Sequence, residues 1–215
     1  MKRLLLLPLL FIGVILSDCK PKRKIVAKKP VIYLYPTIEK KVSVELRVNG
    51  TFTKTEPAYR DGWNIIASPD GKIINIADNK TYPYLFWEAA YSLDWKMNEG
   101  FVVEGKNSAA FLDSTLCKLG LNAIEKNEFI KFWLPELEKN KYSIIRFAGE
   151  DYTRNADLKV LPEPDVTIRV FMLFRASDSF VTLPEQKIAK IKVRMGFTVV
   201  EWGGMNLDEN ISENY

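Results

Sequence analysis

Hydrophobic and polar residues alternate along much of the chain, and this pattern predicts β-strands with one buried face. The clearest case is residues 42–48, where apolar side chains alternate with Ser43, Glu45 and Arg47. Asn49-Gly50 is a turn signal, so residues 51–57 are expected to return as the second strand of a hairpin. Further strands are expected at residues 29–36, 63–67, 72–76, 80–89, 99–105, 142–147, 166–175 and 196–204.

Three of these segments carry additional signals. The segment 29–36 contains a proline near each end, Pro30 and Pro36, which suits an edge or entry strand because proline donates no ladder hydrogen bond. Residues 63–67 and 72–76 are joined by Ser-Pro-Asp-Gly, with Gly71 able to adopt a positive φ. Residues 63–67 and 72–76 are therefore expected to form a tight hairpin.

The period becomes helical between residues 107 and 140. A first helix is expected to end at Gly120, and a second to begin with a capping box of Asn122 and Glu125. Pro135 is expected to kink or restart the second helix. The short link predicts a helical hairpin, and the order of strands, helices and strands predicts an α+β fold: a mainly antiparallel β-sheet with the helical hairpin inserted between strand groups.

The N-terminus carries a basic Met-Lys-Arg start and a 13-residue apolar run, residues 4–16. As a helix this run would span about 20 Å, which is short for a bilayer core of about 30 Å. The following Leu16-Ser17-Asp18-Cys19 resembles the lipobox of bacterial lipoproteins, with Asp18 where a smaller residue is usual. This resemblance implies removal of residues 1–18 and attachment of lipid (palmitate and diacylglycerol) to Cys19; an uncleaved anchor and free secretion are the alternatives.

Charge is divided unevenly along the chain. The whole sequence has a formal charge of +4, but from residue 30 onward 23 lysines and arginines face 26 acidic residues, a net of −3. We therefore expect a signal peptide at 1–18, a basic tether at 19–29, a single domain at 30–204 and a flexible tail at 205–215. The acidic balance of the domain argues against a nucleic-acid partner.

The chain has no histidine and two cysteines, Cys19 and Cys117. Serine and cysteine mechanisms that use histidine are thereby excluded, and no metal or cofactor is expected. Cys117 lies among leucines, so we expect a buried, inert thiol.

The two ends of the expected domain, "KPVIYLYP" and "GFTVVEWGG", resemble an uncharacterised bacterial lipoprotein family. "DGWN", "YLFWE" and the stretch from Asn127 to Asn140 add to this resemblance. It implies one continuous domain and assigns no activity.

Tryptophans next to carboxylates are the candidate site residues. Trp87, Trp95 and Trp202 are candidates for stacking on sugar rings, and Glu88 and Glu201 for a carboxylate pair in acid–base chemistry. Asp61, in "DGWN", is a further polar candidate. The favoured interpretation is structural: neighbours on a strand point to opposite faces, so the tryptophans are expected in the core and the carboxylates in solvent.

These observations favour a membrane-anchored envelope lipoprotein with a binding or interaction domain outside the cytoplasm, at the cell membrane or the outer membrane. Its expected partners are the bilayer, through acylated Cys19, and an envelope protein or glycan. One alternative is a carboxylate-dependent hydrolase or binder of envelope glycans. The other is a structural or assembly factor.

Overall fold

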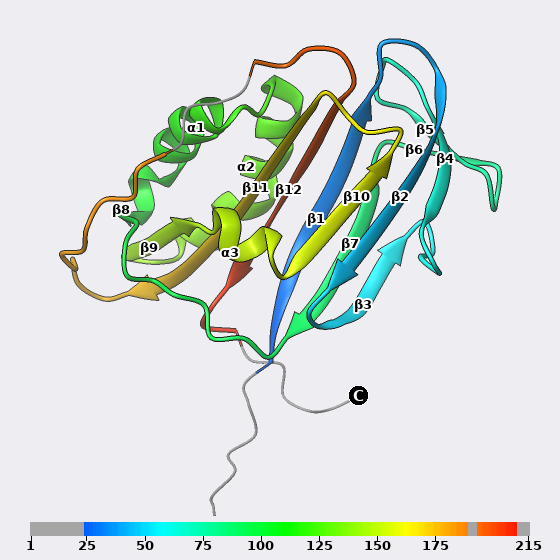
Figure 1. The fold of residues 1–215 in the computed structure, drawn as a ribbon. Helices are drawn as coiled ribbons and strands as arrows, with labels where there is room; N and C mark the ends of the chain where they lie inside the picture. The colour runs from blue at the N-terminus through cyan, green and yellow to red at the C-terminus, as the bar shows by residue number, and fades with distance from the viewer. Residues whose placement is uncertain (1–23, 189–192, 210–215) are drawn as a thin grey trace, which may run out of the picture.

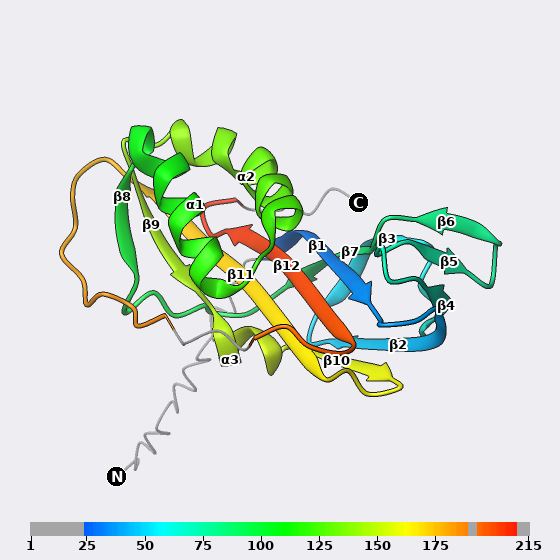
Figure 2. The same ribbon diagram turned by 90° about the horizontal axis from the view of Figure 1, so that it is seen from above.

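Three layers of secondary structure make up the fold: a helix pair, a seven-stranded sheet and a five-stranded sheet (Figures 1 and 2). The computed structural model describes residues 24–188 and 193–209, so Cys19 lies outside the described residues. The expected α+β class is confirmed, with mostly antiparallel strands and the helix pair between two strand groups.

The seven-stranded sheet has the order β3-β7-β1-β12-β11-β9-β8, and β11 and β12 are its one parallel pair of neighbours. Its strands are β1 (Ile25–Tyr35), β3 (Thr51–Glu56), β7 (Leu85–Tyr91), β8 (Phe101–Glu104), β9 (Tyr142–Phe147), β11 (Val166–Ser177) and β12 (Thr198–Asn206). The five-stranded sheet has the order β10-β2-β4-β5-β6. Its strands are β2 (Lys40–Val48), β4 (Trp63–Ala67), β5 (Ile73–Asn75), β6 (Lys80–Tyr82) and β10 (Ala156–Leu161).

Of the two roles expected for the first strand, edge or entry, the edge role is wrong. β1 lies between β7 and β12, and it begins at Ile25, inside the segment assigned to the tether. The sheet tolerates Pro30 because the register with both neighbours shifts just before Val31. At this bulge Lys29 has a φ of 56°, and the proline needs no ladder hydrogen bond.

The hairpin predicted at Asn49-Gly50 is also wrong. β2 pairs with β4 and β10 in one sheet, while β3 pairs with β7 in the other. The turn therefore carries the chain from one sheet to the other, and Asn49 N donates to the carbonyl of Asn155 at 2.8 Å. β10, which the sequence pattern did not reveal, takes the place expected for residues 51–57.

The strand expected at 80–89 also differs: it divides at Pro83 into β6 and β7, which lie in different sheets.

The hairpin of β4 and β5 and the helical hairpin are confirmed. α1 (Ser108–Leu119) ends at Gly120, which adopts the left-handed conformation, and α2 (Ala123–Glu138) starts with the expected capping box. α2 continues through Pro135 without restarting. Pro135 lies on the exposed side of the helix, where solvent is available to the carbonyl that loses its N–H partner. The short elements η1 (Gly105–Asn107) and α3 (Gly149–Thr153) complete the described fold.

Each face of the seven-stranded sheet covers its own hydrophobic core. One core lies between the two sheets and the other between the sheet and the helix pair. β1 and β12 are central to both, and their pairing places Tyr33 opposite Val200 and Val31 opposite Trp202. The two motifs at the ends of the expected domain are thus neighbours in space.

Candidate functional site

Glu88 and Glu201 lie on opposite faces of the seven-stranded sheet. Trp87 faces the core between the sheets, and the alternation of β7 turns Glu88 to the other face, with Phe86. Glu201 points into the core between the sheets, where it contacts Trp87. The two carboxylates that were considered as a candidate pair are therefore separated by the sheet itself.

Glu201 is fully buried, so the prediction that its carboxylate is solvated is wrong. It accepts hydrogen bonds from Trp87 Nε1 at 3.1 Å and from Arg169 Nε at 2.6 Å. Burial by itself would lower the pKa of Arg169, but the Glu201 carboxylate outweighs it and holds this pKa above its usual value. The position of β12 in a sheet covered on both faces explains why both Glu201 and its neighbour Trp202 are inside.

The candidate tryptophans belong to the cores. Trp87 and Trp202 have no exposed surface, in agreement with the structural interpretation of their positions. Trp95 is half-buried, stacked at 6.1 Å on Phe171 and edge-on to Tyr91. In this conformation neither Trp87 nor Trp202 presents a ring to a sugar.

Asp61 is exposed and lies with Asn64 in a surface depression of about 480 Å³. Across residues 24–188 and 193–209, no group of three or more Cys, Asp or Glu side chains is placed to hold a metal ion. Asp61 therefore has a surface position without an assigned ligand.

The helix pair leaves part of the seven-stranded sheet open. Figure 2 shows α1 and α2 above β8, β9, β11 and β12, with β3 and β7 extending beyond the helices. Next to α2 this open face carries a pocket of about 420 Å³, which we call the Lys29–Glu88 pocket. Its principal lining residues are Lys29, Lys54, Glu56, Tyr84, Phe86, Glu88 and Phe132.

Strand register gathers the charged side chains of this pocket. Lys54 lies directly opposite Glu88 in the pairing of β3 with β7, and Glu56 lies opposite Phe86. Directly opposed residues project from the same face of a sheet. Two strands thus place two carboxylates, one ammonium group and one aromatic ring on the open face.

Lys29 adds the second ammonium group, from the bulge in β1. Its backbone N–H donates to Glu88 Oε1 at 3.3 Å, and its Nζ donates to the hydroxyl of Tyr84 at 2.9 Å. The same Nζ lies 5.0 Å from the ring centre of Tyr84 and 5.7 Å from that of Phe86. Lys54 Nζ lies 5.5 Å from the ring centre of Phe86. Cation–π contacts therefore hold both lysines beside the aromatic rings.

The four charged groups of the pocket do not neutralise one another in pairs. Within the described part of the chain, none of Lys29, Lys54, Glu56 and Glu88 forms an ion pair. The pocket consequently offers hydrogen-bond donors and acceptors to a bound molecule, on a wall of aromatic rings.

Sequence reasoning identified Glu88 and missed the other residues of this pocket. The alternation in "YLFWE" already places Tyr84, Phe86 and Glu88 on one strand face. Lys29, Lys54 and Phe132 lie on three other elements, and only the tertiary fold brings them to the same place.

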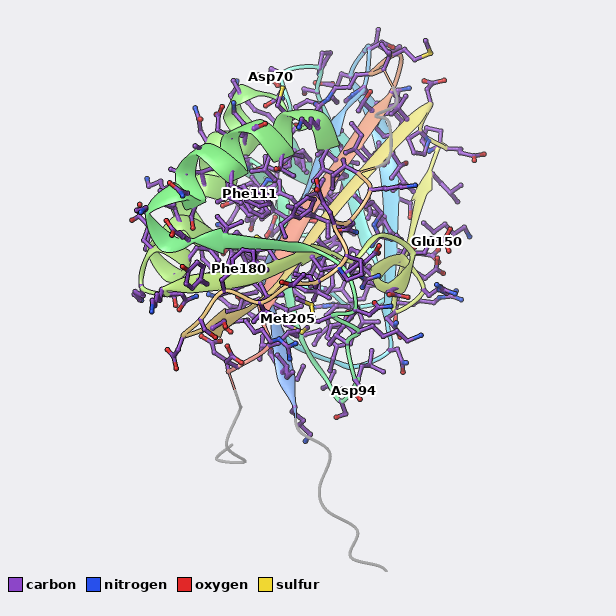
Figure 3. The ribbon with its side chains drawn as sticks, turned by 90° about the vertical axis from the view of Figure 1, so that its left-hand side faces the viewer. Asp70, Asp94, Phe111, Glu150, Phe180 and Met205 are labelled. Carbon is purple, nitrogen blue, oxygen red and sulfur yellow. The ribbon has the colours of Figure 1, made fainter. Side chains whose placement is uncertain are left out.

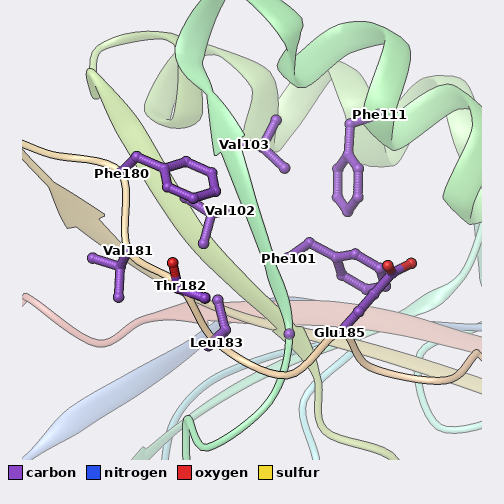
Figure 4. Close-up of a pocket in the computed structure, with 10 residues that line it drawn as sticks. Phe101, Val102, Val103, Phe111, Phe180, Val181, Thr182, Leu183 and Glu185 are labelled. Atoms are coloured by element: carbon purple, nitrogen blue, oxygen red, sulfur yellow. The ribbon is translucent and has the colours of Figure 1, made fainter.

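A second surface feature, the Phe180 groove, runs along β8 at the edge of the same sheet. It is a hollow of about 330 Å³ (Figure 4), and its apolar lining includes Phe101, Val102, Phe111, Phe180, Val181 and Leu183. Figure 3 faces this side of the molecule, with Phe111 and Phe180 labelled near β8. Phe180 is 64% exposed, although its ring lies edge-on to Tyr142. The groove is lined mainly by apolar side chains, and Thr182 and Glu185 are its polar members among the described residues.

The prediction of a buried Cys117 is wrong: this residue is exposed. Leu116, one position earlier in α1, points into the core, and a step of about 100° along the helix turns Cys117 toward solvent.

No helix in the described ranges is long and apolar enough to cross a bilayer.

Comparison with protein-family models, curated proteins and solved structures finds no match for this chain.

Proposed function

We propose that this protein is a membrane-anchored binding protein of the bacterial envelope, and that its domain holds a ligand in the Lys29–Glu88 pocket. One observation carries the proposal: two ammonium groups and two carboxylates converge beside several aromatic rings on an open sheet face. None of these four charged groups takes part in an ion pair with another described residue. Concave sites with aromatic walls and a few convergent polar groups are typical of ligand binding.

The anchor in this proposal is the acylated Cys19. β1 begins at Ile25, six positions later, and six extended residues reach about 20 Å. A tether of this length would keep the start of β1 close to the bilayer, and Lys29 is only four residues further on. The ligand is accordingly expected among molecules of the envelope.

Glu88 and Glu201 do not have the geometry of a hydrolytic carboxylate pair. A glycosidase of the expected type needs two carboxyl groups flanking one bond, about 5 to 10 Å apart. Glu201 is buried against Arg169 and Glu88 is on the other face of the sheet, so these two residues do not meet that requirement.

Chemical footprinting of lysines tests the proposal without knowledge of the ligand. Isolated envelopes and the purified full-length protein in polyoxyethylene detergent would be treated with formaldehyde and a borohydride, and the methylation of each lysine measured by mass spectrometry. A bound ligand should protect Lys54 in envelopes and leave it reactive after purification. Lys41, exposed on β2 in the other sheet, is the matched control and should react equally in both samples. Equal reactivity of Lys54 in the two samples would contradict the proposal.

A further inference from the structure

We infer that the ligand of the Lys29–Glu88 pocket is a neutral saccharide; this inference rests on the proposed function. The ammonium groups and the carboxylates of the pocket need opposite hydrogen-bond partners. An ammonium group only donates hydrogen bonds and a carboxylate only accepts them, whereas a hydroxyl does both. A row of sugar hydroxyls therefore satisfies both kinds of group, each through its own hydrogen bonds.

The register of the strands sets which charged groups of the pocket face each other. Lys54 and Glu88 are directly opposed on β3 and β7. Neither takes part in an ion pair among the described residues, so each remains available to a hydroxyl. A phosphate would suit Lys29 and Lys54 but would be repelled by Glu56 and Glu88. A simple cation would suit Glu56 and Glu88 but would be repelled by Lys29 and Lys54. A neutral ligand with many hydroxyls avoids both forms of repulsion.

The aromatic residues suit the other surface of a sugar ring, its C–H face. Phe132, from α2, is 37% exposed at the margin of the pocket, and Tyr84 and Phe86 are half-buried in its wall. Flat apolar surface beside a few placed polar groups fixes both the position and the orientation of a ligand.

Lys29 is held in place before any ligand arrives. Its positive φ is unusual for a residue with a side chain, and the bulge, the hydrogen bond to Tyr84 and the N–H contact with Glu88 hold that conformation. An ordered lysine loses less conformational entropy when a ligand binds, which favours affinity.

The test uses the purified full-length protein in polyoxyethylene detergent, which carries no sugar or charged group. The probes are cellotetraose, maltotetraose and chitotetraose, with inorganic phosphate and phosphorylethanolamine as charged comparisons. Binding would be measured by saturation-transfer NMR, with affinities from titration. At least one tetrasaccharide should bind, with saturation strongest on ring C–H protons. Glu88→Gln and Lys54→Met should each weaken that binding about tenfold, as expected for a lost hydrogen bond to a charged group.

Lys41→Met and Glu150→Gln are the matched controls, since both residues are exposed and lie outside the pocket. They should leave affinity within about twofold, and circular dichroism should show all four variants folded. Two outcomes would overturn the saccharide inference and leave the proposed function standing. One is binding of a charged probe alone. The other is protection of Lys54 in envelopes with no binding of the three tetrasaccharides. Absence of both protection and binding would overturn the proposed function as well.

Discussion

Arg169 and Glu201 form an ion pair inside the protein, with 2.6 Å between Arg169 Nε and Glu201 Oε2. The two residues are adjacent on the parallel strands β11 and β12, where Arg169 lies opposite Glu201 in the register. The Glu201 side chain is fully buried and the Arg169 side chain is 10% exposed. A carboxylate first considered for catalysis is therefore a structural group.

Glu201→Gln should strongly destabilise the protein. The amide keeps an acceptor for Trp87 but leaves the buried charge of Arg169 without its partner. Removing one member of a buried ion pair typically costs about 3 to 5 kcal/mol in the free energy of unfolding. Urea titration followed by tryptophan fluorescence would measure the loss. Glu88→Gln is the control, because Glu88 is half-buried and has no ion pair with any described residue. Equal stability of the two variants would contradict the structural role of Glu201.

Gly204→Ala should disturb the contact between β12 and α2. A methyl group at this position would lie 2.7 Å from the carbonyl oxygen of Met172 and 2.8 Å from Cζ2 of Trp133. Overpacking of this kind costs about 1 to 3 kcal/mol. Thermal unfolding would report the loss, and a variant as stable as the parent protein would show that α2 does not pack as closely on the sheet.

Asn122→Ala should destabilise α2 by removing the capping box. The Asn122 side chain accepts from Glu125 N at 3.0 Å, and the Glu125 carboxylate accepts from Asn122 N at 2.9 Å. Loss of an N-cap side chain costs about 1 kcal/mol. Asn127→Ala is the matched control, because Asn127 is exposed within the same helix and alanine favours helix formation there. If both variants unfold at the same urea concentration, the cap makes no net contribution.

The thiol of Cys117 should react in the folded protein. In a Cys19→Ser background it is the sole thiol, and Ellman's reagent should titrate one equivalent without denaturant because the residue is exposed. A Cys117→Ser variant in the same background should give no colour. Reaction that begins only in guanidinium would indicate that the thiol is buried, as the sequence pattern suggested.

Cys19→Ser should abolish incorporation of radiolabelled palmitate and release the protein from membranes. Acyl chains contribute about 0.8 kcal/mol for each buried methylene, so their loss removes the anchor. Cys117→Ser serves as the control and should retain both label and membrane association. Label that persists in the Cys19→Ser variant would refute the proposed lipid attachment.

The sequence by itself determined the local elements and the class of fold. Periodicity, capping residues and turn residues act over a few positions. These signals located both helices of the helical hairpin, the β4–β5 hairpin and the strands at 142–147, 166–175 and 196–204. Signals of the same kind could not show which strand is central. Pro30 suggested an edge, and only the bulge shared with β7 and β12 explains how a proline fits between two partners.

Strand pairing and burial were decided by the tertiary structure, because both depend on residues far apart in the chain. Glu201 is enclosed because the five-stranded sheet covers one face of its strand and the helix pair covers the other. Asn49-Gly50 joins two sheets because β10 occupies the edge of β2. The Lys29–Glu88 pocket exists for the same reason. Alternation along one strand places Glu88 beside Tyr84 and Phe86, while long-range pairing and packing bring Lys29, Lys54 and Phe132 to them.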